Sequence, residues 1–392
     1  MKQLKIAQIT PYYFPSIGGV QGVAKYLAEG LAKLGHYVDV ITAYRDHKGR
    51  PAMNVPPIEK INNVTVYRYK SIMNIGHMSI MPGLISHLIK NKYDVIHYHS
   101  YRHPLCDTSA FLGKLKNSTT ILHSHGPFFQ KGEISPVKHF FYNLYDKIAS
   151  VTTLKLTDKI IVFNDWEILN FKKLGVKESK FEFILNAAEE DSFKTYDPTP
   201  FIKKHNLEGK KIILCVGIIN KSKRQDLLIE ALPLIIKDVP EAFLILAGPD
   251  GGLLNTVTEK ANKLNVTNFY KHIGPVFGPE KHLAYEAAHV FALASDKDAY
   301  PLVIAEAMAH GLPIVATDAR GPQSMVHDRI DGFICEKQNV SKIAENIILL
   351  LKDDEIREKM GNAARENAEL NHYAKNTVKK LNNIYFESLK RN

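Results

Sequence analysis

The chain has 392 residues and a formal net charge of +10, with 45% hydrophobic and 23% charged residues. That length favours two domains over one, and the composition is that of a globular protein with a large core. We expect no membrane span, because no apolar run approaches ~20 residues. We expect no signal peptide, because the short apolar run near the N-terminus resembles a strand and has no cleavage site of small residues. The positive charge suits anionic partners, but no long Lys/Arg block or Arg/Gly tract points to nucleic acid.

The three cysteines are Cys106, Cys215 and Cys335. They are too few and too widely spaced for a disulfide framework or a metal motif, and such usage is typical of a reducing compartment. We therefore expect a cytoplasmic protein.

Short apolar runs alternate with helix-length segments in the first half of the chain. The expected strands are Lys5–Thr10, Tyr37–Thr42, Val64–Tyr69, Val95–Tyr98, Thr119–His123 and Lys159–Phe163, with amphipathic segments at Val20–Leu34 and Pro136–Leu156. Alternation of this kind predicts a parallel sheet with helices on both faces.

The alternation pauses in the acidic, proline-containing stretch Ala187–Pro200, where we place a linker at 191–200. It restarts with strands at Lys211–Gly217, Phe243–Ala247, Phe269–Ile273, Val290–Leu293 and Ile314–Thr317, and three helices follow at Val340–Leu351, Asp354–Leu370 and Tyr373–Leu389. The sequence thus predicts an α/β protein with two doubly wound domains, 1–190 and 201–372. Ligands of such sheets bind beyond the carboxyl ends of the strands.

Two glycines, Gly18 and Gly19, follow the first strand and precede a helix. Glycines there let the backbone approach a phosphate, although a plain strand-to-helix turn has the same pattern. The segment is not GxGxxG, which argues against a nicotinamide or flavin cofactor.

Four histidines, His97, His99, His123 and His125, lie at or just past the ends of two predicted strands. They could bond sugar hydroxyls or bind a metal, or they could be structural. His125 precedes a Gly-Pro turn, so we expect it to be the most accessible to a ligand.

A cationic cluster, Lys221, Lys223 and Arg224, follows the first strand of the second half. Such a cluster can neutralise a diphosphate leaving group, although a solvated turn would look similar.

The segment 295–308 combines a loop with the start of an apolar helix near Leu302. A helix N-terminus offers free amides to an anion. Glu306 lies about one turn into this helix and needs hydrogen-bond donors, for example two ribose hydroxyls. Asp298 lies in the loop, where it could contact a sugar. The alternative is that Asp298 caps the helix and Glu306 is a satisfied helix residue.

Taken in order, these segments resemble the retaining glycosyltransferase family 4, whose members have the GT-B fold of two Rossmann-like domains facing across a cleft. The resemblance covers nearly the whole chain and is carried by Gly18–Val20, 95–100, 122–126, 184–187, 216–232, 244–252, 273–276, 293–321 and 331–335. It implies transfer of a sugar from a nucleotide diphosphate sugar to an acceptor hydroxyl, with retention of configuration, and a last helix that crosses back onto the first domain.

The resemblance also implies roles for single residues. Glu306 stands where the family binds the ribose, and Asp298 stands where the family has a Glu that contacts the donor sugar. Lys223 matches the family's diphosphate-binding Lys, while Ile218 replaces its Arg, for which Lys221 could substitute. The expected catalytic residues are His125, Lys223, Asp298 and Glu306, and the expected donor-binding residues are Gly18, Gly19, Lys221, Arg224, Tyr300, Pro301, Leu302, Val303 and Glu306.

Asp296 and Asp298 spell the Asp-x-Asp signature with which single-domain GT-A enzymes hold Mn²⁺ or Mg²⁺. The diphosphate already has helix amides, the glycine loop and Lys223 as expected partners. We therefore expect no metal and no other cofactor, with Asp296 dispensable and Asp298 required.

The acceptor is expected to be a sugar, a lipid-linked compound or a small molecule. The segment 136–155 mixes lysines with Phe140 and Phe141, so it could contact the inner face of a membrane, although a core-facing helix is the favoured alternative. Rival functions are a nucleotide-sugar 2-epimerase, a dinucleotide oxidoreductase, which the missing GxGxxG disfavours, and a non-catalytic sugar-nucleotide-binding protein.

Overall fold

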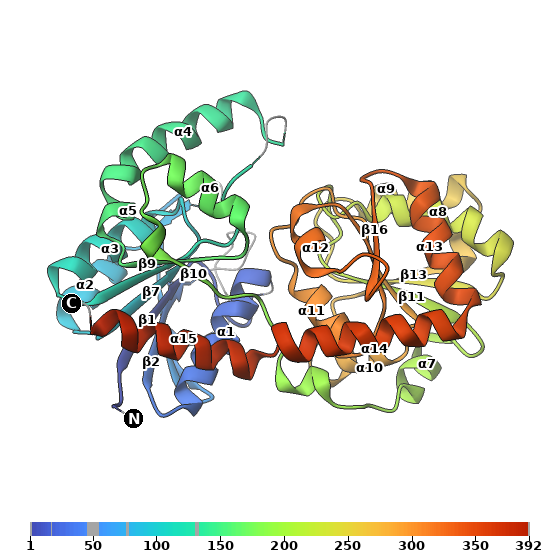
Figure 1. The fold of residues 1–392 in the computed structure, drawn as a ribbon, viewed down its shortest axis with the longest axis horizontal. Helices are drawn as coiled ribbons and strands as arrows, with labels where there is room; N and C mark the ends of the chain where they lie inside the picture. The colour runs from blue at the N-terminus through green and yellow to red at the C-terminus, as the bar shows by residue number, and fades with distance from the viewer. Residues whose placement is uncertain (1, 17, 45–54, 76–77, 130–132, 391–392) are drawn as a thin grey trace. The chain divides into compact units, whose positions relative to one another are not determined.

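The computed structural model describes residues 2–16, 18–44, 55–75, 78–129 and 133–390 (Figure 1). They form two compact units: unit 1 is Met1–Leu185 with Ala374–Asn392, and unit 2 is Asn186–Tyr373. The 191–200 stretch lies within unit 2, where it includes most of the short helix η2 (Glu190–Phe193) and the start of α7 (Thr199–His205).

Unit 1 is built on an eight-stranded sheet of order β10-β9-β8-β7-β1-β2-β4-β3, parallel except that β3 runs antiparallel to β4. Its strands are β1 (Lys5–Thr10), β2 (Tyr37–Ala43), β3 (Ile58–Ile61), β4 (Val64–Tyr69), β7 (Val95–His99), β8 (Thr119–His123), β9 (Lys159–Val162) and β10 (Phe181–Phe183). A separate two-stranded antiparallel sheet is formed by β5 (Met73–Ile75) and β6 (Met78–Ile80).

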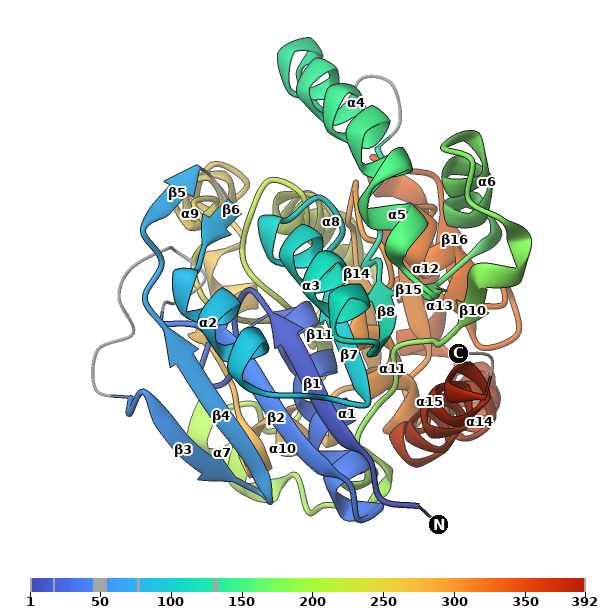
Figure 2. The same ribbon diagram turned by 90° about the vertical axis from the view of Figure 1, so that its left-hand side faces the viewer.

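Helices cover both faces of this sheet (Figures 1 and 2). They are α1 (Gly19–Lys33), α2 (Pro82–Lys90), α3 (Pro104–Leu115), α4 (Pro136–Val151), α5 (Thr153–Leu156), α6 (Asp165–Lys173) and α15 (Ala374–Leu389), with the 3-10 turn η1 (Glu178–Lys180). The predicted helix Pro136–Leu156 is divided at Thr152 into α4 and α5.

The last helix, α15, packs into unit 1 through close and polar contacts. A Cβ at Gly30 of α1 would come within 2.5 Å of Val378 Cγ2, so glycine permits the approach of the two helices. His36 Nε2 lies 2.8 Å from Asn382 Oδ1, and His97 Nδ1 lies 2.6 Å from the Tyr385 hydroxyl. The chain's final segment is therefore part of the first unit's core.

Unit 2 is built on a parallel six-stranded sheet of order β13-β12-β11-β14-β15-β16. Its strands are β11 (Lys211–Val216), β12 (Ala242–Ala247), β13 (Tyr270–Gly274), β14 (Val290–Leu293), β15 (Ile314–Thr317) and β16 (Gly332–Cys335). Its further helices are α8 (Gln225–Asp238), α9 (Leu254–Lys263), α10 (Gly278–Glu286), α11 (Leu302–Ala309), α12 (Arg320–Met325), α13 (Val340–Lys352) and α14 (Asp354–Asn371), with η3 at Thr267–Phe269.

The strand order reverses at one point in each sheet. In unit 1 the reversal lies between β1 and β7, and in unit 2 it lies between β11 and β14. Connections leave such a switch point in opposite directions, so a crevice opens at the carboxyl ends of the two strands. The predicted glycine, lysine and aspartate residues follow β1, β11 and β14. His97 and His99 lie within β7, His123 ends the neighbouring β8, and His125 follows β8.

The three cysteines are buried and form no disulfide. Within the described ranges, none of the helices has the length and apolar content needed to cross a bilayer.

Candidate functional site

The loop after β11 is ordered by its own side chains. Asn220 Oδ1 accepts hydrogen bonds from the backbone N–H groups of Ser222 and Lys223, both at 3.0 Å. Arg224 then takes a left-handed conformation, with φ 51°, immediately before α8 begins. This turn fixes the direction in which the Lys223 side chain leaves the backbone.

Lys223 forms an ion pair with Asp298 from the loop after β14. The two side chains are largely buried, with 19% and 13% of their surface exposed. Asp298 is held in turn by the Gly321 N–H, which donates to its backbone oxygen at 2.9 Å. The structure therefore brings together two of the predicted catalytic residues.

Arg224 has different partners. Its guanidinium bonds Asp226 at 3.0 Å and Asp296 at 3.1 Å, and Lys260 reaches Asp226 at 3.1 Å. The hydrogen bond to Asp226 and that to Asp296 outweigh burial and raise the pKa of Arg224. The Arg224 charge is thus balanced within the protein. Lys223 is the cation of this cluster that meets Asp298, and Lys221 is exposed on the turn.

Glu306 is 8% exposed on α11 and has two partners on α10. Lys281 Nζ lies 2.6 Å from its Oε1, and the Tyr285 hydroxyl donates to its Oε2 at 2.9 Å. Burial, followed by the charge of Glu306, raises the pKa of Tyr285 well above its usual value. Burial alone would lower the pKa of Lys281, but the charge and hydrogen bond of Glu306 outweigh it and the pKa is raised. A carboxylate has about four acceptor positions, so Glu306 keeps capacity for two hydroxyl donors.

The start of α11 is held at several points. The Asn186 side-chain amide donates to the backbone oxygen of Tyr300 at 2.6 Å. A Cβ at Gly321 would come within 2.7 Å of Pro301 Cδ, so only glycine allows α12 this close to the turn. The first N–H groups of the helix, those of Leu302 and Val303, have no partner inside it. Tyr300 itself is 4% exposed, so its contribution to a ligand would come through the backbone.

Gly18 and Gly19 differ in what surrounds them. A Cβ at Gly18 would meet Gln21 Oε1 at 2.5 Å, whereas a Cβ at Gly19 would meet nothing within 4 Å. A side chain at Gly18 would therefore displace the end of the Gln21 side chain, whereas the space beside Gly19 is open.

The four histidines of unit 1 lie together at the ends of β7 and β8. His99 Nε2 lies 2.8 Å from Gln8 Oε1, and His99 Nδ1 lies 2.9 Å from His125 Nε2. With Gln8 Oε1 as the acceptor, the consistent assignment has the His99 proton on Nε2, and His99 Nδ1 accepts from His125. His125 Nδ1 is then left as an acceptor. As expected, His125 is the least buried of the four histidines.

Burial keeps these histidines neutral. It lowers the pKa of His99 to about 3 and the pKa values of His97, His123 and His125 well below their usual value. A neutral His125 can accept a hydrogen bond from a sugar hydroxyl, but it carries no positive charge that could stabilise an anion.

A metal fits this cluster poorly. Ligand atoms of His97, His99 and His123 lie within 4.8 Å of one another. However, the three rings are within 6–25° of parallel, and the lone pairs of parallel stacked rings do not converge on one point. Both nitrogens of His99 are also engaged in hydrogen bonds. The arrangement is that of a stack of neutral rings.

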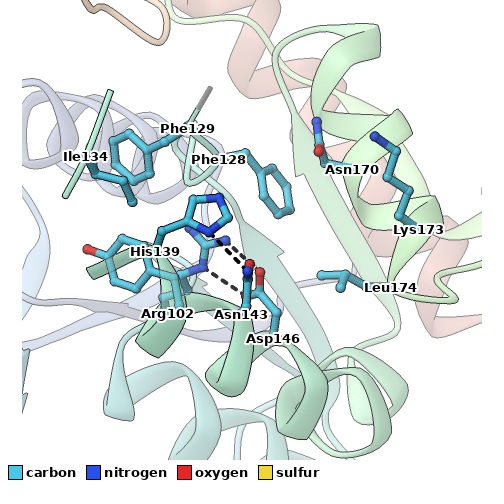
Figure 3. Close-up of a pocket in the computed structure, with 11 residues that line it drawn as sticks. Arg102, Phe128, Phe129, Ile134, His139, Asn143, Asp146, Asn170, Lys173 and Leu174 are labelled. Atoms are coloured by element: carbon cyan, nitrogen blue, oxygen red, sulfur yellow. Dashed lines mark hydrogen bonds and ion pairs between the residues drawn. The ribbon is translucent and has the colours of Figure 1, made fainter. Parts of the chain in front are cut away.

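A cavity of about 190 Å³ lies beside α4, next to residues that follow β7 and β8 (Figure 3). Arg102 holds one wall: it bonds Asp146 at 2.9 and 2.6 Å and lies 4.6 Å from the centre of the Tyr142 ring. Asn170 and Lys173 of α6 lie on the other side of the Phe128 ring. The cavity thus combines aromatic surface with amide and cationic groups.

Two family models match this chain. One, described as Glycosyltransferase Family 4, matches residues 17–191, and the other, Glycosyl transferases group 1, matches residues 198–367. The chain belongs to the family 4 glycosyltransferases. It is a glycosyltransferase of the GT-B type that uses a nucleotide sugar, and the fold class predicted from the sequence is confirmed.

Similar proteins span the length of this glycosyltransferase. It is 23% identical to N-acetyl-α-D-glucosaminyl L-malate synthase of Bacillus anthracis, over 96% of each chain. It is 25% identical to UDP-Gal:α-D-GlcNAc-diphosphoundecaprenol α-1,3-galactosyltransferase of Escherichia coli, over 81% of each chain. The structure of Anabaena HepE in complex with UDP matches 98% of this chain and 100% of its own, with a TM-score of 0.77 and 16% identity. Sucrose-phosphate synthase of Thermosynechococcus elongatus matches 100% of both chains, with a TM-score of 0.80 and 19% identity.

The histidine stack predicts how the stability of this glycosyltransferase depends on pH. The unfolded chain binds protons below about pH 6.5 that the folded chain excludes, so the free energy of unfolding should fall as the pH drops below that value. Replacing His123 by Phe should reduce this pH slope by up to about one proton. Urea unfolding at a series of pH values measures this slope. The fluorescence of Trp166, the one tryptophan of the chain, reports on the unfolding of unit 1.

The matched control is His139→Asn, because His139 is exposed. That variant should keep the wild-type slope. A His123→Phe protein that folds and has the wild-type slope would contradict the assignment of neutral, buried histidines.

Proposed function

We propose that this glycosyltransferase transfers a sugar from a nucleoside diphosphate sugar to an acceptor hydroxyl, with retention of anomeric configuration and without a metal. One observation carries the proposal: the Lys223–Asp298 pair, the N-terminus of α11 and Glu306 all belong to elements that follow β11 and β14 at the switch point of unit 2. These groups match the three parts of such a donor.

In the proposed complex each part of the donor meets a chemically suited group. The ribose hydroxyls donate to the free acceptor positions of Glu306. The diphosphate meets the Lys223 ammonium and the amides of Leu302 and Val303, and the sugar hydroxyls meet Asp298. Two crystal structures of Anabaena HepE, a protein of the same fold, are complexes with UDP and with UDP-glucose, which supports a nucleotide-sugar donor for this chain.

In the proposed reaction, the bond between the anomeric carbon and the diphosphate oxygen breaks while the bond to the acceptor oxygen forms on the same face. The acceptor's proton passes to the leaving diphosphate oxygen. Positive groups preorganised around the diphosphate stabilise the charge that grows there in the transition state. Among the residues of unit 1, His125 Nδ1 would accept from a sugar hydroxyl, and the open space beside Gly19 suits the approach of a phosphate group.

The acceptor is proposed to bind unit 1 at the cavity beside α4. Asn170 and Lys173 offer donors there, and Phe128 offers an apolar ring face against which a sugar can stack. Aromatic faces and amides are the groups with which proteins commonly hold sugars. The acceptor is therefore a sugar, free or carried on a lipid or a small molecule.

A donor screen tests the proposed reaction. With UDP-, GDP- and ADP-sugars, we expect one nucleotide class to be consumed, slowly without acceptor and faster with a sugar acceptor. NMR of the product should show the anomeric configuration of the donor. Conversion of donor into an epimeric sugar without acceptor would identify an epimerase instead, and no consumption of any donor would identify a non-catalytic binding protein.

Glu306 should contribute mainly to donor binding. Glu306→Ala is expected to raise the donor Kd about tenfold or more, because a carboxylate–hydroxyl hydrogen bond contributes about 1.5–3 kcal/mol to ground and transition states alike. Calorimetric titration with the donor measures the change. The control is Tyr285→Phe, which removes a partner of Glu306 but keeps the carboxylate and should have a smaller effect. Equal affinity of Glu306→Ala and wild type would reject the ribose assignment.

Divalent metal should not be needed. Asp296 and Asp298 are each paired with a cation of the β11 loop, so their carboxylates are already balanced. We expect the initial rate to be unchanged in excess EDTA and after addition of Mn²⁺ or Mg²⁺. Asp298→Ala should lose most activity, whereas Asp296→Ala should keep it. The loop would instead be a metal site if EDTA abolished activity, added metal restored it, and Asp296→Ala and Asp298→Ala were equally damaging.

A further inference from the structure

Helix α4 extends away from the other helices of unit 1 (Figures 1 and 2). Its buried residues are Asp146 and Ala149. Six large apolar side chains are instead exposed, each by 46–69% of its surface: Val137, Phe140, Phe141, Leu144, Ile148 and Val151. The favoured sequence interpretation, a core-facing helix with a solvated edge, is therefore wrong.

These six side chains form one stripe. At about 100° per residue they fall within a sector about 100° wide, which is the width of the apolar face of an ordinary amphipathic helix. Asp146 and Ala149 lie on the other side of the helix. The apolar face of α4 thus points to solvent and its polar face points to the protein, the reverse of the usual arrangement.

Specific contacts fix the helix in this rotation. Asp146 forms a bidentate ion pair with Arg102, and both side chains are 8% exposed. The Tyr145 hydroxyl donates to Asp107 of α3 at 2.7 Å. Turning the stripe towards unit 1 would break both contacts and leave the buried Arg102 without its carboxylate, at a high cost.

The stripe is bordered by positive charge. Lys138 and Lys147 lie at its two edges, and Lys155 follows on α5; all three are exposed. Asp146 is the one acidic residue between Pro136 and Leu156, and it is buried against Arg102. The exposed charge of this segment is therefore entirely cationic. A cavity of about 360 Å³ adjoins the stripe; it is lined by Phe140, Leu144 and Leu174 together with the polar residues Asn143, Asp146 and Lys147.

We propose that the α4 stripe docks onto an anionic lipid bilayer, with its apolar side chains in the interface and its lysines at the phosphate level. Charge complementarity selects this occupant: apolar stripe and lysine border are the features that bind a helix to anionic lipid. A second copy of the chain fits less well, because a two-fold contact would bring the lysine borders of both copies together.

Docking would also position the proposed acceptor cavity. His139, Tyr142, Asn143 and Asp146, on other faces of α4, line that cavity. A docked helix therefore places the cavity close to the bilayer surface, where a lipid-carried acceptor would be presented. The docking itself does not depend on the proposed transfer reaction, and it is tested without donor or acceptor.

Co-sedimentation of the full chain with vesicles tests the proposal. Wild type should bind vesicles of mixed phosphatidylglycerol and phosphatidylcholine at low salt. Its binding to pure phosphatidylcholine vesicles, or to the mixed vesicles at high salt, should be at least tenfold weaker. Phe140→Ser with Phe141→Ser should lower binding at least tenfold, and Lys138→Gln with Lys147→Gln should remove the preference for anionic lipid. The matched control is Leu370→Ser on α14, which removes an equally exposed apolar side chain and should bind as wild type.

A second readout keeps the test independent of folding defects. Phe141→Trp should show a blue-shifted emission on addition of anionic vesicles, while circular dichroism confirms that every variant is folded. Absence of wild-type binding at low salt, or wild-type binding by the double Phe variant, would overturn the proposal. A third outcome would also overturn it: wild type is a dimer in light scattering and does not bind vesicles, and the double Phe variant is a monomer. A second copy of the chain, and not a bilayer, would then cover the stripe.

Discussion

Three ion pairs hold the carboxyl edge of the unit 2 sheet: Lys223 with Asp298, Arg224 with Asp296, and Lys281 with Glu306. Each joins a cation near β11 or on α10 to a carboxylate that follows β14. Charges buried to this degree are costly unless paired, so the pairs fix the loops before any ligand arrives. In the proposed reaction the diphosphate competes with Asp298 for Lys223, which frees the Asp298 carboxylate to accept from sugar hydroxyls.

Unit 1 differs from unit 2 in that the histidines at the ends of its strands are uncharged. Burial favours neutral imidazole, and the bond from His99 to Gln8 decides which nitrogen of His99 carries the proton. With that proton on Nε2, His99 accepts at Nδ1 from His125 Nε2, and the Nδ1 of His125, the least buried of the four rings, is left as an acceptor. A neutral, acceptor-bearing surface suits sugar hydroxyls, whereas the paired charges of unit 2 suit a nucleotide. The two units therefore divide the chemistry that the proposed function needs.

Helix α4 connects this chemistry to an interaction surface. A stripe of exposed phenylalanine and aliphatic side chains costs free energy in water, and monomeric proteins rarely expose a continuous apolar patch without a use for it. The Arg102–Asp146 pair prevents the helix from hiding the stripe, and the same pair forms a wall of the adjoining cavity. The Arg102–Asp146 ion pair thus holds α4 with its apolar face towards solvent, and it also forms one wall of the cavity beside α4.

The sequence by itself determined the local structure and the family. β1, β4, β8, β14 and β15 have the predicted bounds, because each is a short run rich in β-branched and aromatic residues. β3, β5, β6 and β10 were not predicted. β3 and β10 are edge strands without a buried side chain, so they lack the apolar run of a buried strand. At the site, the motifs identified Lys223, Asp298 and Glu306, but not Lys281 and Tyr285, whose spacing of four on one helix was the available signal. Only the tertiary structure decided the strand order, the partners of each charge and the direction of the α4 stripe. Periodicity shows that a helix has an apolar face, but the contacts made by residues such as Arg102, distant in the chain, decide whether that face meets the core or the solvent.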